Sequence, residues 1–146
     1  MQTAEQAIRA VVASGHTLTV YDDYSSEENA AFLDQLHDEL GISVIHISDH
    51  IDHPSPNYRW VLIHAQQQAV AHNAHLLIIE SDVIVRPDTI SRLQQAVSDS
   101  VGMVAAVTVN EEGEINFPYE YGRRSKPTGN ARNVSRFVAP CSLWIC

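Results

Sequence analysis

Positive charge is scarce in this chain. Its 146 residues include 9 lysines and arginines against 18 aspartates and glutamates, and the formal net charge is −9. Because a protein of this charge is repelled by the phosphates of nucleic acids, we expect no nucleic-acid partner. The few basic residues gather late in the sequence, at Arg123, Arg124, Lys126, Arg132 and Arg136. This segment either meets the phosphates of a ligand or is a solvated loop, and the sequence leaves both interpretations open.

Long apolar runs and cysteines are also scarce. No run approaches the roughly 20 apolar residues that a membrane-spanning helix needs, and the first residues lack the order of a signal peptide. The two cysteines, Cys141 and Cys146, stand close together and do not form a disulfide framework. These absences predict a cytoplasmic protein with reduced thiols. With 45% apolar and 18% charged residues, residues 1–146 are expected to form a single globular domain.

Helical and extended patterns alternate along the sequence. Apolar residues recur at helical spacing over residues 3–14, 26–40, 58–72 and 87–97. Apolar and β-branched runs predict strands at 17–21, 42–47, 76–79, 101–109, 115–117, 134–138 and 143–146. The alternation predicts an α/β fold with a mainly parallel sheet covered by helices on both faces. The runs at 76–79 and 101–109 are expected to be buried strands.

Two carboxylates follow the apolar run at 76–79. Glu80 and Asp82 flank Ser81, and alternate residues of an extended segment project the same way, so we expect both carboxylates to converge on one point. Two hard oxygen ligands suit Mg²⁺ or Mn²⁺, with substrate phosphates completing the coordination. The alternative is an acid that merely ends the strand and begins a turn, and the triplet taken alone favours that alternative.

A second acidic segment follows the predicted strand at 17–21. Asp22 and Asp23 stand there, just before Ser25, Ser26 and Glu27. A carboxylate at the end of a parallel strand can accept hydrogen bonds from a base N–H or a ribose hydroxyl. The alternative is a turn rich in aspartate and serine that caps the next helix.

The order of the elements and the two acidic motifs together resemble the nucleotide-sugar-binding part of the family 2 glycosyltransferases. That family has the GT-A fold, a Rossmann-like three-layer sandwich. In it, one strand runs into a D-D-x-S-x-[DE] segment, and a later strand runs into a D-x-D signature followed by a proline-started helix. The matching residues here are 22–27, 80–82 and Pro87. The resemblance covers most of the chain, up to about Phe137.

The resemblance implies metal-dependent, inverting transfer of a hexosyl group from a nucleotide-diphospho-sugar, such as a UDP-sugar, to a saccharide or lipid-linked acceptor. The residues that it assigns to nucleotide binding are Asp22, Asp23, Arg59 and Ser81. It assigns the Mn²⁺ or Mg²⁺ to Asp82, with Glu80 as a longer-armed companion where the family usually has aspartate.

The chain also departs from the family pattern. Family members begin with an apolar strand before the first helix, whereas Met1 leads directly into that helix here. The acceptor-binding part of the family, with its catalytic base, comes after the point that corresponds to Cys146. We therefore expect a partial donor-binding domain with weak or no transferase activity alone. Missing a central strand would leave unpaired strand edges, which makes a homodimer or a borrowed strand a hypothesis.

Other interpretations stay open. One is a noncatalytic module that binds a nucleotide or nucleotide-sugar. Another is a phosphoryl-receiver-like domain, although the single lysine lies in a predicted loop. A separate zinc hypothesis rests on one histidine-rich segment, whose spacing matches no standard zinc motif and favours solvated side chains. Its residues are His46, Asp49, His50, Asp52 and His53.

Overall fold

The chain is a mixed α/β protein whose strands pair in parallel. The computed structural model describes residues 2–110, 112–114 and 141–145. The chain divides into two compact units, of which residues 1–87 with 139–146 form the first and residues 88–138 the second. Among the described residues, no helix is long and apolar enough to cross a membrane.

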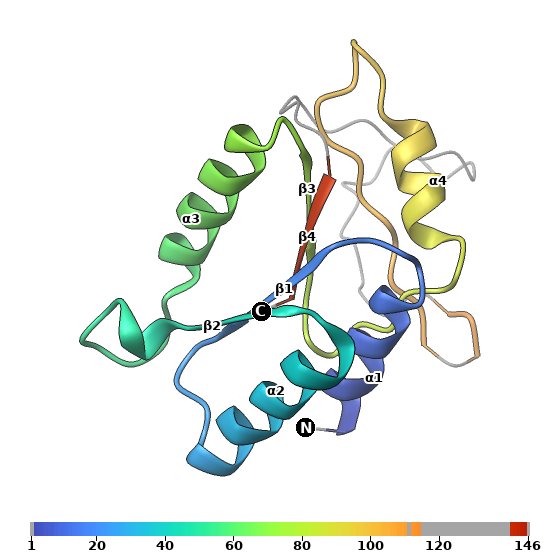
Figure 1. Cartoon of the computed structure of the whole chain (residues 1–146). Coiled ribbons are helices and arrows are strands. Elements are labelled where there is room, and N and C mark those ends of the chain that lie inside the picture. Colours follow the sequence, from blue (N-terminus) through green and yellow to red (C-terminus); the bar gives the residue numbers. More distant parts are fainter. Residues whose placement is uncertain (1, 111, 115–140, 146) are drawn as a thin grey trace, which may run out of the picture. The chain divides into compact units, whose positions relative to one another are not determined.

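Helices and strands alternate along the first unit (Figure 1). Its α-helices are α1 (Gln2–Val12), α2 (Glu27–Leu40) and α3 (Tyr58–Ala71), and a 3-10 turn, η1 (Ile47–Asp49), precedes α3. Its strands are β1 (Leu18–Asp22), β2 (Ser43–His46), β3 (His75–Ile79) and β4 (Cys141–Ile145). The order of elements predicted over residues 3–79 is confirmed, and β4 matches the extended segment expected near the last residues.

The four strands form one sheet in the order β2-β1-β4-β3, and every neighbouring pair is parallel. Helices α1 and α2 lie on one face of this sheet and α3 lies on the other (Figure 1). Parallel sheets need such cover because helical crossovers connect their strands. The expected parallel sheet with helices on both faces is therefore present in the first unit.

Strand β4 lies between β1 and β3. We expected unpaired edges where the family has a central strand, but β1 pairs with β2 on one side and with β4 on the other. The same chain thus fills the position beside β1, and the outer strands of the sheet are β2 and β3. The homodimer stays a hypothesis, without an open edge of β1 to support it.

Local signals set the ends of α2. The Oγ atom of Ser26 accepts a hydrogen bond from the backbone N–H of Asn29, which caps the first turn. At the other end, Gly41 adopts φ +66°, and its N–H donates to the carbonyl of His37. Glycine takes this left-handed conformation without the steric cost that a Cβ atom brings. Between the two caps, Leu33 and Leu36 are buried.

An apolar cluster joins the strands to α3. Its buried members are Tyr21, Ile47, Val61 and Ala65, against which Ile45, Ile51, Trp60 and Leu76 pack. The cluster draws on β1, η1 and α3, so it fixes the start of α3 next to the carboxyl end of β1.

Strand β3 is less buried than its apolar sequence predicts. Ile79 is buried, but the side chain of Ile78 is 36% exposed. Among the described strands, β3 is the last in the order of this sheet and has one neighbour, β4. The prediction of a strand buried on both faces is therefore wrong for β3.

The second unit contains α4 (Thr89–Ala96), which follows Pro87 as predicted. Asp88, at the residue before the helix, forms a 2.7 Å ion pair with Arg92. The buried strand predicted at 101–109 is wrong, since this described segment has only isolated bridges, at Val101 and Val109, the first of them antiparallel to Ser98. Three large apolar side chains of this segment are exposed, namely Met103, Val107 and Val109.

Several predictions fall outside the described residues. They are the strands at 115–117 and 134–138 and the basic segment from Arg123 to Arg136.

Candidate functional site

The two acidic motifs lie at the same edge of the sheet. In the strand register, Val20 of β1 pairs with Ile145 of β4, which pairs with Ile79 of β3. Asp22 stands two residues beyond Val20, and Glu80 directly follows Ile79. Only β4 separates the two strands, and neighbouring strands are about 4.8 Å apart, so the strand ends stand about 10 Å apart. The carboxyl edge of one sheet thus carries both motifs.

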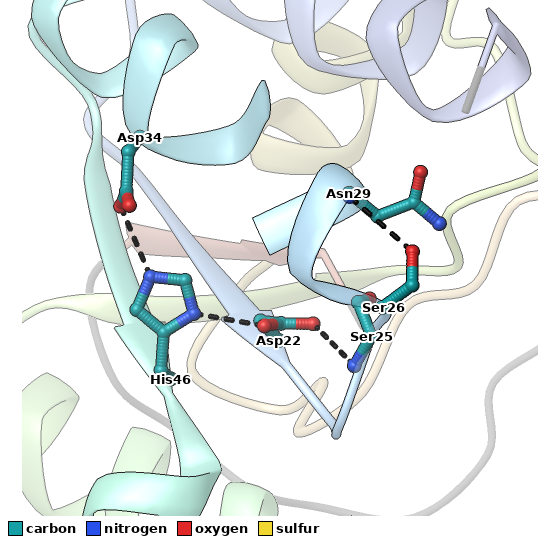
Figure 2. A network of polar contacts seen from close by, with 6 residues as sticks. All are labelled: Asp22, Ser25, Ser26, Asn29, Asp34 and His46. Atoms are coloured by element: carbon teal, nitrogen blue, oxygen red, sulfur yellow. Dashed lines mark hydrogen bonds and ion pairs between the residues drawn. The ribbon is translucent and has the colours of Figure 1, made fainter. Parts of the chain in front are cut away.

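Asp22 belongs to a polar network that links β1, β2 and α2 (Figure 2). Its carboxylate is 5% exposed, and Oδ1 accepts a 3.1 Å hydrogen bond from the backbone N–H of Ser25. Oδ2 lies 2.8 Å from Nδ1 of His46, and Nε2 of the same ring lies 3.0 Å from Oδ1 of Asp34 on α2. Both oxygens of Asp22 are therefore engaged within the protein.

The charge of His46 completes this network. Hydrogen bonds to Asp34 and Asp22 raise the pKa of His46, and they outweigh the opposing effect of burial. A neutral imidazole has one N–H and can donate to one carboxylate, whereas the imidazolium can donate to both. The protonated ring is the form that satisfies both acids.

Asp23 is held by the residue that precedes α3. Its Oδ1 accepts a 2.7 Å hydrogen bond from the side-chain amide of Asn57, and its Oδ2 accepts a 3.0 Å bond from the backbone N–H of Asn57. Asn57 is 3% exposed, and its amide also donates to the carbonyl of His53 at 3.1 Å. Partial burial alone would raise the pKa of Asp23, but the hydrogen bonds from Asn57 and Ser55 prevail and lower it.

These contacts leave Asp23 able to bind a ligand. A lowered pKa keeps the carboxylate ionised at neutral pH. An ionised carboxylate has about four acceptor positions, of which the two hydrogen bonds from Asn57 use two. Asp23 can therefore accept a further hydrogen bond from a donor such as a base N–H or a hydroxyl.

The residue after Asp23 has an unusual backbone. Tyr24 adopts φ +64°, in the left-handed region. Its hydroxyl donates a hydrogen bond to the carbonyl of Ile51, and its side chain is 38% exposed. Asp23 and Tyr24 thus contact the same loop, at Asn57 and Ile51.

Aromatic and histidine rings stack beside this loop. Trp60 stacks on His64 with ring centroids 5.0 Å apart and on His50 with centroids 5.2 Å apart. The hydroxyl of Tyr21 lies 2.6 Å from Nδ1 of His64. Burial lowers the pKa of His64, and the nearby His50 adds to this effect. The neutral form of His64 is the one that this environment favours.

The zinc hypothesis gains no support from this arrangement. His46 lies between two acids, and His50 lies on the ring of Trp60. Within residues 2–110, 112–114 and 141–145, no three histidine, cysteine or acidic side chains come together as a metal site.

The acidic triplet after β3 lies in a turn. Strand β3 ends at Ile79, and the N–H of Val83 donates a 3.1 Å hydrogen bond to the carbonyl of Glu80. The expectation that an extended chain aligns Glu80 and Asp82 is therefore wrong. Both carboxylates are exposed and Ser81 is half-buried.

The donor set of this turn fits a hard divalent cation. Neither Glu80 nor Asp82 has a side-chain hydrogen bond or ion pair within the described part of the chain, and both offer carboxylate oxygens. Mg²⁺ and Mn²⁺ are bound by one or two carboxylates together with substrate phosphates. The turn can therefore contribute to such a site, although it cannot enclose the ion by itself.

Arg59 lies in the first turn of α3, two residues after Asn57, and its side chain is exposed. The chain thus places a cation close in sequence to the residue that holds Asp23. Of the predicted nucleotide contacts, Asp22, Asp23 and Arg59 gather around β1 and the start of α3, whereas Ser81 lies in the turn after β3.

Sequence reasoning missed His46 and Asn57 as partners of the two aspartates. The parallel register pairs Asp22 with His46, so a correct alignment of the two strands would have found the first contact. No local pattern marks Asn57, because its contact with Asp23 depends on how the loop after η1 folds back.

Comparison with known proteins found no family model, no curated protein and no solved structure that matches the chain. The family 2 glycosyltransferase assignment therefore stays a prediction that rests on the two motifs and their order.

Proposed function

We propose that this chain binds a nucleotide-diphospho-sugar together with Mg²⁺ or Mn²⁺, as the donor-binding part of a family 2 glycosyltransferase with the GT-A fold. The observation that carries the proposal is the placement of both acidic motifs at the carboxyl edge of one parallel sheet. Ligands of open α/β sheets bind at this edge. A separation of about 10 Å suits a ligand that carries a base at one end and a diphosphate at the other.

The motifs take different roles. Asp23 accepts a hydrogen bond from the base or ribose, because its half-buried carboxylate keeps acceptor positions that its described contacts with Asn57 do not use. Asp22 has a supporting role, since it is buried, with 5% of its surface exposed, and bonded to Ser25 and His46. Arg59 contributes positive charge near the nucleotide, as the resemblance implies.

Asp82 and Glu80 would hold the cation, with Ser81 beside the diphosphate. A divalent cation bound there neutralises the charge that develops on the leaving diphosphate. Both side chains are exposed, so phosphate oxygens can reach the same ion. The donor is a UDP-sugar or similar, and the acceptor is a hydroxyl of a saccharide or lipid-linked sugar. We assign no catalytic base.

A noncatalytic nucleotide-binding module is the second candidate. The observation that favours it is the burial of Asp22, which leaves the half-buried Asp23 as the accessible acid of its motif. The phosphoryl-receiver interpretation is weaker, because Asp22 is 5% exposed and hydrogen-bonded on both oxygens.

Titration calorimetry with UDP, GDP and their sugars, with and without Mn²⁺, tests the proposal. We expect binding that requires Mn²⁺ and that Asp82→Asn weakens at least tenfold. Asp38→Asn is the matched control, because it removes one exposed carboxylate from α2. Absence of binding to every nucleotide in the presence of Mn²⁺ would overturn the proposal. Binding that ignores both Mn²⁺ and Asp82→Asn would instead favour the noncatalytic module.

A further inference from the structure

Tyr24 has a backbone conformation that is unfavourable for a residue with a Cβ atom, and its side chain is partly exposed. A left-handed conformation at a residue with a Cβ atom costs about 1–2 kcal/mol, and glycine or asparagine would adopt it more easily. Tyr24 has φ +64° and is 38% exposed. Backbone strain of this kind persists where the surrounding structure holds it, and it concentrates at functional sites.

Core packing does not account for this tyrosine. Tyr21, three residues earlier, is buried in the apolar cluster against α3, whereas Tyr24 is not a member of that cluster. With 38% of its surface exposed, Tyr24 can present part of its ring to a ligand.

The ring is also fixed in place. Its hydroxyl donates to the carbonyl of Ile51, and the preceding residue, Asp23, accepts two hydrogen bonds from Asn57. Two consecutive residues are thus tied to the loop that leads into α3. A ring that is held by its hydroxyl, next to a residue that is itself held by its side chain, loses little further freedom when a ligand binds to it.

We propose that Tyr24 is a stacking platform for the base of the bound nucleotide. Asp23 accepts a hydrogen bond from the polar edge of the base, and the adjacent ring of Tyr24 packs against its flat face. Aromatic side chains bind bases in this way with little dependence on base identity, because every base has a π-face. This inference rests on the proposed nucleotide binding and assigns a specific contact to it.

A competing explanation is that Tyr24 merely fastens the loop through its hydroxyl. Two variants separate these roles. Tyr24→Phe keeps the ring and removes the hydrogen bond to Ile51, whereas Tyr24→Gly removes the ring and suits the left-handed backbone. If Tyr24 stacks on the base, Tyr24→Gly loses affinity for the nucleotide and Tyr24→Phe keeps most of it. If Tyr24 only holds the loop through its hydroxyl, both variants lose a similar amount of affinity.

The test compares UDP with inorganic diphosphate, both with Mn²⁺, by calorimetry. Diphosphate lacks a base, so its affinity reports the metal and phosphate contacts and the integrity of the fold. We expect Tyr24→Gly to weaken UDP binding by roughly tenfold or more while diphosphate binding is unchanged. Equal losses for UDP and diphosphate, or UDP binding that Tyr24→Gly leaves intact, would overturn the platform without touching the proposed function. Failure of the wild-type protein to bind UDP would overturn both.

Discussion

The contacts of His46 with Asp22 and Asp34 allow us to predict how much a substitution of His46 destabilises the protein. In His46→Leu, the buried carboxylate of Asp22 keeps only the N–H of Ser25 as a donor. Leaving a buried acceptor without its partner costs about 1–3 kcal/mol. Asp34 is 65% exposed, so its ion pair with His46 adds less than about 1 kcal/mol. We expect His46→Leu to lower the free energy of unfolding by about 2 kcal/mol at pH 6.

The same difference depends on pH. Because the pKa of His46 is raised in the folded protein, the protonated ring stabilises the fold. This contribution is complete below the unfolded pKa of about 6.5, and it is lost as the pH rises through the higher folded pKa. The destabilisation by His46→Leu should therefore shrink between about pH 6 and pH 9. The lowered pKa of His64 acts in the opposite sense, but it is common to both proteins and cancels in the difference.

Urea unfolding of both proteins at a series of pH values is the measurement. His16→Leu is the control, because the side chain of His16 has no hydrogen bond or ion pair within the described part of the chain. A difference between wild type and His46→Leu that stays constant from about pH 6 to pH 9 would refute the reasoning. So would a nuclear magnetic resonance titration in which His46 loses its proton below the ordinary histidine pKa.

Three further substitutions test the fold around the site, each by chemical unfolding. Asn57→Ala removes a buried side-chain amide that donates to Asp23, and we expect the free energy of unfolding to fall by about 1–3 kcal/mol. An unchanged free energy of unfolding would contradict a stabilising contact between Asn57 and Asp23. Leu36→Ala empties a buried site under α2 and should cost about 2–5 kcal/mol, whereas a loss below about 1 kcal/mol would mean that this side chain is not in the core. Gly41→Ala forces a Cβ atom into φ +66° and should cost about 1 kcal/mol, and a stabilised variant would show that the helix ends differently.

The parts of the fold that depend on nearby residues could be predicted from the sequence. Ser26 and Gly41 set the two ends of α2. Each does so through a contact within one helical turn, so the sequence signal for each helix end is local. The alternation of helices and strands likewise predicted a parallel sheet and placed both acidic motifs at its carboxyl edge.

The parts that depend on distant partners could not be predicted. Residues 101–109 have the composition of a strand, but a strand also needs a neighbour along its length, and this described segment has only isolated bridges at Val101 and Val109. The position of β4 between β1 and β3 is a choice among strand orders that no local pattern encodes. The hydrogen bonds from Asn57 to Asp23 could not be predicted either, because they depend on the path of the loop between the two residues.

The placement of β4 also has a consequence for how the molecule folds. Strands β1 and β2 are joined by α2 and can pair after a short loop closes, but Leu18 of β1 pairs with Leu143 of β4, near the other end of the sequence. Closing so long a loop is entropically costly and slows folding. Because β4 lies between β1 and β3 in the described sheet, the spacing between the two acidic motifs is set in that late step. We therefore expect the ability to bind nucleotide to emerge with the slowest phase of refolding.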